Sequence, residues 1–376
     1  MSAAGEGNRE VAERAIATWE SFCEDLKGAS AVLSRAATPG DEQNLAEGLR
    51  FLMRMLRAGF ENAFEYANPE SPRLGPMVTP TLVYEGVTSD ARYHHAFIDG
   101  GERYVIAGHR GDAPLIEFSV YNGKAGIHAE SHSLGSLTER DLVVGADGDL
   151  EVAFGPDPRQ GNWLRTDVNT RYLMVREYAQ DWSGLRPGAF KIEREGGSGR
   201  RRALSLSEVE AGLAGTLDFV RRAPQFWAGI SDYWRGFAVN RFEPQLSADP
   251  RTDIAAPTGH HFSCGWFELE AGEALMVCFT PRSAQYWSLG VANYWYETLG
   301  FADGGSEINN GSAIHAADGS VRAVIANAQA PVGAQNWIDT RGHREGTMIF
   351  RWSRSAEPVP PIATEKLRVE DWEMSG

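Results

Sequence analysis

The sequence lacks the features that mark a secreted or membrane-spanning protein. Its 376 residues include only three cysteines, Cys23, Cys264 and Cys278, and their spacing forms neither a disulfide framework nor a zinc pattern. No apolar run reaches the length of a transmembrane helix, about 18 residues. The N-terminal segment MSAAGEGNREVAERA contains no apolar core of a secretory signal. We therefore expect a cytoplasmic protein without a membrane partner.

Positive charge is also scarce. Lysine and arginine number 36 against 51 aspartates and glutamates, which gives a formal net charge of −15. Nucleic acids are bound by clustered basic side chains, and the one basic run, at residues 200–202, follows a Gly-rich stretch typical of a solvated linker. We expect no nucleic-acid partner. The sequence contains no Gly-rich phosphate loop, nucleophile elbow or HExxH motif either, and we expect no cofactor.

What the sequence does contain is an internal repeat. GADGDLEVAFGPDPRQGNWL at residues 145–164 matches AADGSVRAVIANAQAPVGAQNWI at residues 316–338, with the same Ala-Asp-Gly and Asn-Trp elements in the same order. A repeat of this spacing is too long for a solenoid unit and indicates two copies of a β-module. We expect features that both copies keep to be scaffold, and features that only one copy has to be candidates for function.

The apolar spacing changes along the chain. It predicts helices over residues 8–35 and 41–66, which form an antiparallel hairpin. From residue 104 onward, apolar and polar residues alternate between Asn-Gly and Asp-Gly turns, as in antiparallel strands. Residues 205–240 return to helical spacing, and Pro224 is expected to divide them into two helices. The strand pattern then resumes at His260.

These patterns predict an α+β protein. An N-terminal helical hairpin is followed by two duplicated antiparallel β-sandwich-like modules that are joined by a helical linker. The corresponding divisions are an N-terminal helical region (1–80), a first β-module (81–195), a helical linker (196–250) and a second β-module (251–376).

The two copies diverge directly after the Asn-Trp pair that they share. Asp339 stands where the first copy has Arg165, and His343 stands where it has Asn169. A carboxylate and an imidazole on neighbouring loop positions can form an acid/base pair or hold a polar ligand. The alternative is an aspartate that orders its own turn and a histidine that bonds to the backbone.

A second difference is the aromatic segment NYWYE at residues 293–297, which has no counterpart in the first copy. Its side chains can line a concave site for a flat apolar ligand, with Glu297 as the carboxylate, although core packing explains such a segment more often. Arg351 either anchors an anionic group or forms a structural ion pair. The candidate substrate-binding residues are Tyr93, Trp295, Tyr296, Asn336, Trp337 and Arg351.

One string resembles a metal site. On a strand, His128, Glu130 and His132 would project from one face, as a three-ligand site requires. The surrounding Gly- and Ser-rich sequence favours a solvated loop instead, and we expect no metal.

The C-terminal segment NWIDTRGHREGTMIFRW, preceded by ADGSVRAVIAN and NYWYETLGF, resembles the signature of the DUF1214 family. GNWLRTDVNTRYLMVREY and SDARYHHAFIDGGERYVIAGHRGDA resemble the family's first-copy segments, although the chain has SDAR where Asn-Pro-Asp is usual. The resemblance covers about residues 85–355. It implies a β-rich bacterial fold, often encoded near catabolic genes, and no particular reaction.

We therefore expect a metal-independent enzyme of proton-transfer type: a hydrolase, lyase or isomerase. Its substrate would be a small hydrophobic oxygenated metabolite, such as a terpenoid, a steroid or an aromatic catabolite. His343 would be the general acid or base, Asp339 its partner and Glu297 a second carboxyl group. The alternative is a non-catalytic β-sandwich protein that binds a small molecule or a carbohydrate. Homo-oligomerisation is compatible with both.

Overall fold

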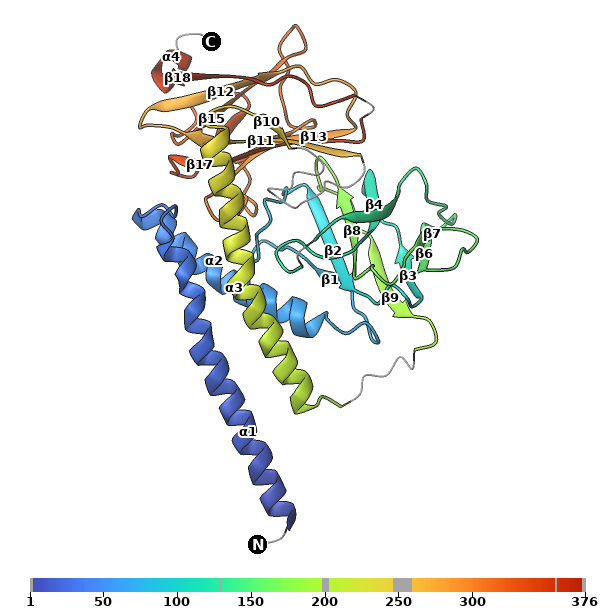
Figure 1. Cartoon of the computed structure of the whole chain (residues 1–376). Coiled ribbons are helices and arrows are strands. Elements are labelled where there is room, and N and C mark those ends of the chain that lie inside the picture. The colour runs from blue at the N-terminus through green and yellow to red at the C-terminus, as the bar shows by residue number, and fades with distance from the viewer. Residues whose placement is uncertain (1–2, 129, 198–202, 246–258, 356, 374–376) are drawn as a thin grey trace.

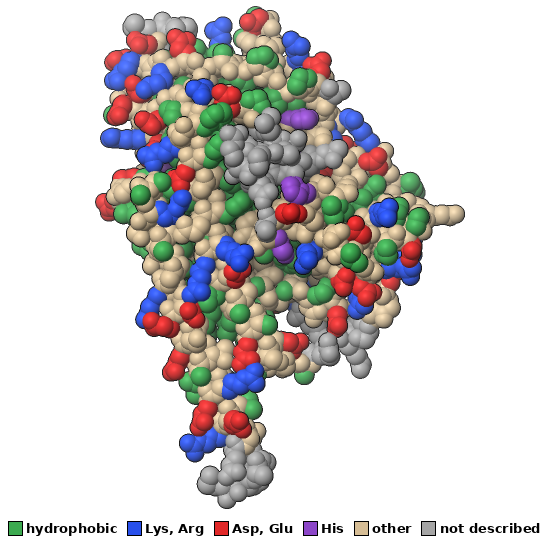
Figure 2. Space-filling view, in the orientation of Figure 1, with side chains coloured by type: hydrophobic (Ala, Val, Ile, Leu, Met, Phe, Trp, Pro, Cys, Tyr) green, Lys and Arg blue, Asp and Glu red, His purple; other side chains and the backbone are tan. Residues whose placement is uncertain are grey.

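The computed structural model describes residues 3–128, 130–197, 203–245, 259–355 and 357–373. The basic run at residues 200–202 lies outside them. Figure 1 shows α1 (Ala3–Leu26) and α3 (Leu206–Phe237) side by side, the first β-module to the right of α3 and the second β-module above it, with helix α1 projecting beyond the rest. On the face in Figure 2, acidic and basic side chains are interspersed along this projecting end. None of the described helices is both long and apolar enough to cross a membrane.

The N-terminal helical region is confirmed, although its two helices pack against α3 and not chiefly against each other as a hairpin would. Helix α1 (Ala3–Leu26) continues into a 3₁₀-helix, η1 (Lys27–Ser34), and the chain then turns into α2 (Glu42–Phe60) and a short π-helix, η2 (Glu61–Glu65). The carboxylate of Asp41 caps α2 by accepting the N–H of Asn44 at 3.0 Å. An acidic N-cap of this kind satisfies one of the free N–H groups at the start of a helix.

The linker helix α3 (Leu206–Phe237) is continuous, so the predicted break at Pro224 was wrong. Ser205 and Glu208 form a capping box at its N-terminus. Burial of a large apolar side chain contributes about 1.5–3 kcal/mol, while a proline inside a helix costs about 3 kcal/mol. Trp227 and Trp234 are both buried on this helix, and together they outweigh the cost of the proline.

The first β-module consists of two sheets, one five-stranded and one four-stranded. The five-stranded sheet has the order β1 (Gly75–Pro76), β2 (Ala91–Phe97), β8 (Tyr172–Tyr178), β4 (Leu115–Tyr121), β5 (Ser133–Thr138). The four-stranded sheet has the order β7 (Trp163–Arg165), β6 (Asp149–Gly155), β3 (Tyr104–His109), β9 (Ala189–Arg194).

The second β-module repeats this order strand for strand, which confirms the duplication. Its five-stranded sheet has the order β10 (Glu243–Gln245), β11 (His260–Glu268), β17 (Glu345–Ser353), β13 (Tyr286–Ala292), β14 (Glu307–Asn309). Its four-stranded sheet has the order β16 (Trp337–Asp339), β15 (Val321–Ala326), β12 (Glu273–Phe279), β18 (Ala363–Arg368), and helix α4 (Val369–Glu373) follows.

Strand pairing in both modules is antiparallel except for β6 with β7 and β15 with β16, which run parallel. The short strands β1 and β10 precede the residues at which the two modules were expected to begin, because each pairs with the first long strand of its module. The edge strand of each five-stranded sheet therefore comes from the segment that precedes the module in the sequence.

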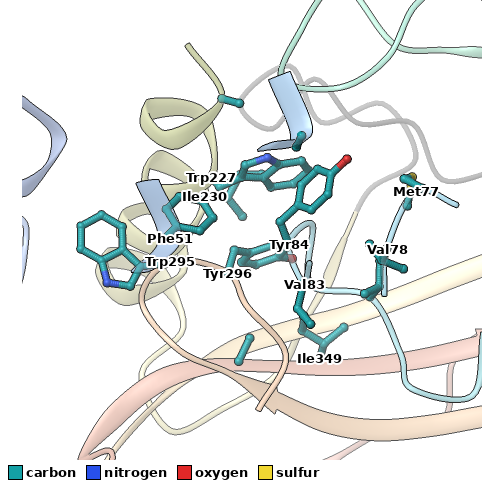
Figure 3. Close-up of a cluster of buried hydrophobic side chains, with 14 of the residues drawn as sticks. Phe51, Met77, Val78, Val83, Tyr84, Trp227, Ile230, Trp295, Tyr296 and Ile349 are labelled. Carbon is teal, nitrogen blue, oxygen red and sulfur yellow. The ribbon is translucent and has the colours of Figure 1, made fainter. Parts of the chain in front are cut away.

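Each module has a core of its own between its two sheets. The largest apolar cluster lies elsewhere, between the helices and the other faces of the two five-stranded sheets. Figure 3 shows part of this shared core, in which Phe51 of α2, Trp227 of α3 and Ile349 of β17 come together. The helices and the two modules consequently form one packed body.

Gly48 allows α2 to approach the second module. A Cβ atom at this position would lie 2.4 Å from the ring of Trp295 and 2.6 Å from Leu33. We expect Gly48→Ala to lower the free energy of unfolding by about 1–3 kcal/mol, because the buried ring cannot move aside. The measurement is equilibrium unfolding in urea.

Gly229→Ala is the matched control, since Gly229 also lies inside a helix but a Cβ there would meet no atom within 4 Å. This variant should gain about 0.5–1 kcal/mol from helix propensity. Equal stabilisation by both substitutions would contradict the close packing of α2.

Candidate functional site

A cavity of about 150 Å³ lies where the two five-stranded sheets meet α3. Its wall is formed by β2, β4 and β8 of the first module, by β11 and β17 of the second, by Trp227 of α3 and by loop residues between Met77 and Val87. Residues from both copies of the repeat therefore share one cavity, which is the usual place for a ligand site in a protein built from packed units.

Aromatic side chains dominate the wall. Trp227 and Tyr296, both labelled in Figure 3, are stacked. Their ring centroids are 5.5 Å apart and their planes are inclined by 11°. The other cavity-lining aromatic residues are Tyr93, Tyr121, Tyr172, Tyr178 and Phe262. Burial raises the pKa of the Tyr93, Tyr121, Tyr172 and Tyr296 hydroxyls, so these groups stay neutral and can donate hydrogen bonds.

Two buried arginines occupy equivalent positions in the two copies. Arg176 on β8 lies opposite Glu117 on β4, whereas Arg351 on β17 lies opposite Ser288 on β13. The Nη1 atom of Arg176 is 3.1 Å from Oε1 of Glu117. Among the described residues, no carboxylate oxygen lies within 4.0 Å of the Arg351 guanidinium. The second copy thus keeps the cation and lacks its partner.

Arg351 is 7% exposed and stays charged. Burial acts to lower its pKa, while Tyr93 and, from a longer range, Glu307 act to raise it, and the net effect is a raised pKa. Its guanidinium donates to the carbonyl of Gly86 and lies 5.6 Å from the ring centroid of Phe262. A guanidinium has five N–H donors, so most of its capacity is left for other acceptors.

A third buried cation in the wall is matched by a carboxylate. Nζ of Lys124 lies 2.7 Å from Oε1 of Glu85, and the lysine side chain is only 2% exposed. The same ammonium lies 5.4 Å from the ring centroids of Tyr84 and Tyr172. With two of the three cations paired, the wall retains an excess of positive charge and suits a ligand with an anionic group.

His260 lines the cavity and is paired with a buried carboxylate, Glu117. Nε2 of His260 lies 3.1 Å from Oε2 of Glu117, and Nδ1 lies 2.8 Å from the Ser353 hydroxyl. Burial acts to raise the pKa of Glu117, but His260 and the arginines Arg176 and Arg354 outweigh it and hold this pKa well below its usual range. Burial lowers the pKa of His260 despite the carboxylate. The pair is therefore a neutral imidazole beside a carboxylate.

Three of the residues proposed from the sequence line the cavity, namely Tyr93, Tyr296 and Arg351. Sequence reasoning missed Glu117, His260 and Trp227. The signal for Glu117 was its place inside the otherwise apolar strand LIEFSVY, where a carboxylate requires a buried partner.

His343 and Glu297 belong to one polar network, but it lies beneath α2 and does not line the cavity. Nε2 of His343 lies 2.8 Å from Oε2 of Glu47 on α2. Asn293 donates to Glu47 at 2.8 Å and to Glu297 at 2.9 Å, and Glu297 forms an ion pair with Arg54 of α2. The network joins α2 to the second module.

Trp295 is fully buried under the same helix. Its Nε1–H donates to the backbone carbonyl of Asn44 at 2.8 Å, and its ring stacks on Phe51 with centroids 5.7 Å apart. The aromatic segment at residues 293–297 is thus divided between two places, since Tyr296 lines the cavity while Trp295 packs against α2.

Asn336, Trp337 and Asp339 lie at the far sheet of the second module. The Asn336 side chain donates to the carbonyls of Ile314 and Arg322 at 2.8 and 3.1 Å, and Asn162 makes the equivalent bonds in the first copy. Trp337 Nε1–H donates to a backbone carbonyl. Oδ1 of Asp339 accepts a backbone N–H two residues on. Each of these side chains orders its own loop.

His128, Glu130 and His132 make separate local contacts. Nδ1 of His128 accepts the backbone N–H of Lys124 at 2.9 Å, and Glu130 accepts from Asn122 at 3.0 Å. Within the part of the chain that the structure describes, no three His, Cys, Asp or Glu side chains are grouped so as to hold a metal ion.

Two carboxylates meet where the modules touch. Oδ2 of Asp90 accepts from Tyr286 and Asn309, each at 2.8 Å, while Glu307 accepts from the hydroxyl of Ser89 at 3.0 Å. Burial and the charge of Glu307 raise the pKa of Asp90 to about 7. The boundary between the modules therefore contains a group that titrates near neutral pH.

Comparison with known proteins places these features in a family. A family model described as "Protein of unknown function (DUF1214)" matches residues 84–181 and 268–357, one segment in each module. A solved structure of an uncharacterized protein from Burkholderia cenocepacia is 28% identical, with a TM-score of 0.88 over 94% of this chain and 97% of that one. The VPA0106 protein from Vibrio parahaemolyticus is 10% identical, with a TM-score of 0.45 over 91% of this chain and 100% of that one. No curated protein matches.

We expect the His343–Glu47 contact to be a pH-dependent attachment of α2. Burial acts to lower the pKa of His343, but the hydrogen bond and charge of Glu47 outweigh it and raise this pKa. A raised histidine pKa stabilises the fold below the pKa of the unfolded chain, about 6.5, and this stabilisation is lost as pH rises through the folded value. His343→Gln should cost about 1–3 kcal/mol near pH 6 and much less at pH 9.

The measurement is denaturant unfolding at several pH values, with the exposed His315→Gln as control. Since Glu47 is itself held at a lowered pKa, the loss should also shrink below about pH 4.5. If His343 serves catalysis instead, the variant will keep wild-type stability and lose turnover.

Asp90 should make the stability of the fold depend on pH in the direction opposite to the usual one for a carboxyl group. Its folded pKa lies above the ordinary value of 3.8, so the folded chain binds more protons than the unfolded chain between about pH 4 and pH 7, and stability falls as pH rises through this window. The slope is at most about 1.4 kcal/mol per pH unit. Asp90→Asn should flatten this part of the curve, and a variant curve parallel to that of the wild type would refute the assignment.

Proposed function

We propose a function for this chain, which belongs to the DUF1214 family, from the cavity between its two modules. The protein binds a small, largely apolar compound that carries an anionic group, and it is a metal-independent enzyme of proton-transfer type: a hydrolase, lyase or isomerase. The observation that carries the proposal is Arg351, a buried cation without a carboxylate partner in the wall of an aromatic cavity.

Electrostatics support an anionic ligand. Removing a charge from water costs several kcal/mol unless a partner compensates it. In the first copy Glu117 compensates Arg176, and in the second copy Ser288 stands at the position of that glutamate. A ligand carboxylate can supply the absent charge, since its two oxygens match the fork of a guanidinium.

The His260–Glu117 pair supports proton-transfer chemistry. A neutral imidazole next to a carboxylate can accept a proton and be stabilised as the cation. His260 borders the cavity, so this pair is better placed for a ligand there than His343 and Glu297. The catalytic roles of His343, Asp339 and Glu297 stay predictions, and the stability measurements on His343→Gln bear on them.

One observation favours the alternative of a non-catalytic small-molecule-binding protein. Both ring nitrogens of His260 are already within hydrogen-bond distance of other groups, Glu117 and Ser353. The imidazole can take a proton from a ligand only by giving up one of these contacts. Binding without turnover would leave this arrangement undisturbed.

The proposal includes a cytoplasmic location and no nucleic-acid partner. It is supported by the net charge of −15 and by the free thiols of Cys23, Cys264 and Cys278, which suit a reducing compartment. A homo-oligomer remains part of the proposal, because helix α1 exposes large apolar side chains, among them Ile16 and Trp19, each 59% exposed.

Turnover of pooled small carboxylic acids, followed by LC–MS with and without EDTA, tests the proposed function. We expect product from the wild type in both conditions. Arg351→Gln should lower kcat/KM about 10- to 100-fold, the effect of removing a charged hydrogen bond. Arg322→Gln is the control, because Arg322 lies exposed on β15 of the same module.

Loss of product with EDTA would contradict metal independence. Binding of an acid without any product would contradict the enzyme and support the non-catalytic binding protein. Equal turnover by Arg351→Gln and the wild type would show that the cavity does not take part in the reaction.

A further inference from the structure

We infer that the ligand of the cavity is an aryl carboxylate with a single ring, such as a benzoate. Its carboxylate would bind Arg351, and its ring would lie against the stacked pair of Trp227 and Tyr296. The inference rests on the proposed function, since it names the class of compound for the same cavity.

The size of the cavity selects among the classes of apolar metabolite. Its volume is about 150 Å³, and an apolar protein cavity of about this size accommodates benzene. One six-membered ring with small substituents therefore fits. The fused rings of a steroid and the larger terpenoid skeletons exceed this volume and would have to extend out of the cavity. Of the three classes of compound expected from the sequence, the cavity therefore favours the aromatic one.

Gly86 brings the cation and the ring wall together. Its carbonyl oxygen accepts from the Arg351 guanidinium, and its own Cα approaches the Tyr296 ring so closely that a Cβ would lie 2.4 Å from a ring carbon. Gly86 adopts a positive φ of 54°, which glycine accepts without strain. A ligand that reaches both features therefore needs its carboxylate close to its ring, as in a benzoate.

An aromatic ring would extend the stack that Trp227 and Tyr296 form, and this favours it over a saturated ring. The Trp227 and Tyr296 planes are inclined by only 11°, and Tyr296 holds a positive φ of 61°, a conformation that is uncommon for a residue other than glycine. Aromatic pairs contribute about 0.5–1.5 kcal/mol beyond the area that they bury, which corresponds to about 2- to 13-fold in affinity.

Calorimetric titration of the full chain tests the inference with four probes: benzoate, benzamide, cyclohexanecarboxylate and anthracene-9-carboxylate. Benzoate should bind most tightly. Benzamide, which lacks the charge, should bind at least 10-fold more weakly, and cyclohexanecarboxylate about 2- to 13-fold more weakly. Anthracene-9-carboxylate should be excluded by its size.

Variants separate the contacts. Arg351→Gln should weaken benzoate binding about 10- to 100-fold, with Arg322→Gln as the matched control. Trp227→Leu removes one of the two stacked rings, so it should weaken benzoate binding more than cyclohexanecarboxylate binding. Should Arg351→Gln fail to fold, Arg351→Lys keeps the charge and should still weaken binding, because an ammonium lacks the fork.

The outcomes distinguish the inference from the proposed function. If anthracene-9-carboxylate or cyclohexanecarboxylate binds as tightly as benzoate and Arg351→Gln weakens it, the single aromatic ring is refuted and the anion-binding cavity stands. If no carboxylate binds, or if benzamide binds as tightly as benzoate, the proposed function itself fails.

Discussion

Both faces of each five-stranded sheet have to be buried, and the architecture follows from this constraint. The central strands β4, β8 and β13 are buried at every residue. One face of each sheet packs on the four-stranded sheet of its own module, but the other face has no cover within the module. Helices α2 and α3 provide that cover and turn two small sandwiches into one body around a shared core. The continuity of α3 through Pro224 and the close approach of α2 at Gly48 both serve this burial.

The same constraint explains why polar chemistry concentrates at the shared core. Where two duplicated sheets and a helix meet, their side chains cannot fill the space as regularly as within one sandwich, and a cavity remains. The charged groups around it are removed from water, so each requires a counter-charge or a hydrogen bond. Lys124 and Arg176 have carboxylates within the first module. Arg351 donates to a single backbone carbonyl, and Glu307 acts on its charge only from a longer range.

Local patterns in the sequence predicted the elements of the fold because local physics determines them. The two N-terminal helices, the start of the linker helix and the duplicated strands all rest on residues close together in the chain. The break at Pro224 was predicted wrongly because the burial that outweighs it comes from distant elements. For the same reason, no sequence pattern places His343 beside Glu47, which lies 296 positions away in the chain.

The candidate site shows how a repeat conceals its most informative difference. Comparison of the copies drew attention to residues that only the second copy has, such as Trp295 and His343, and these side chains attach α2. The difference at the cavity is the residue opposite an arginine that both copies keep. It becomes visible only when strand pairing places Ser288 at the position of Glu117. A difference of this kind between two copies leaves a buried cation without a counter-charge in one of them, although both copies hold the same arginine. A binding site can therefore arise in one copy while the other remains a neutralised structural element.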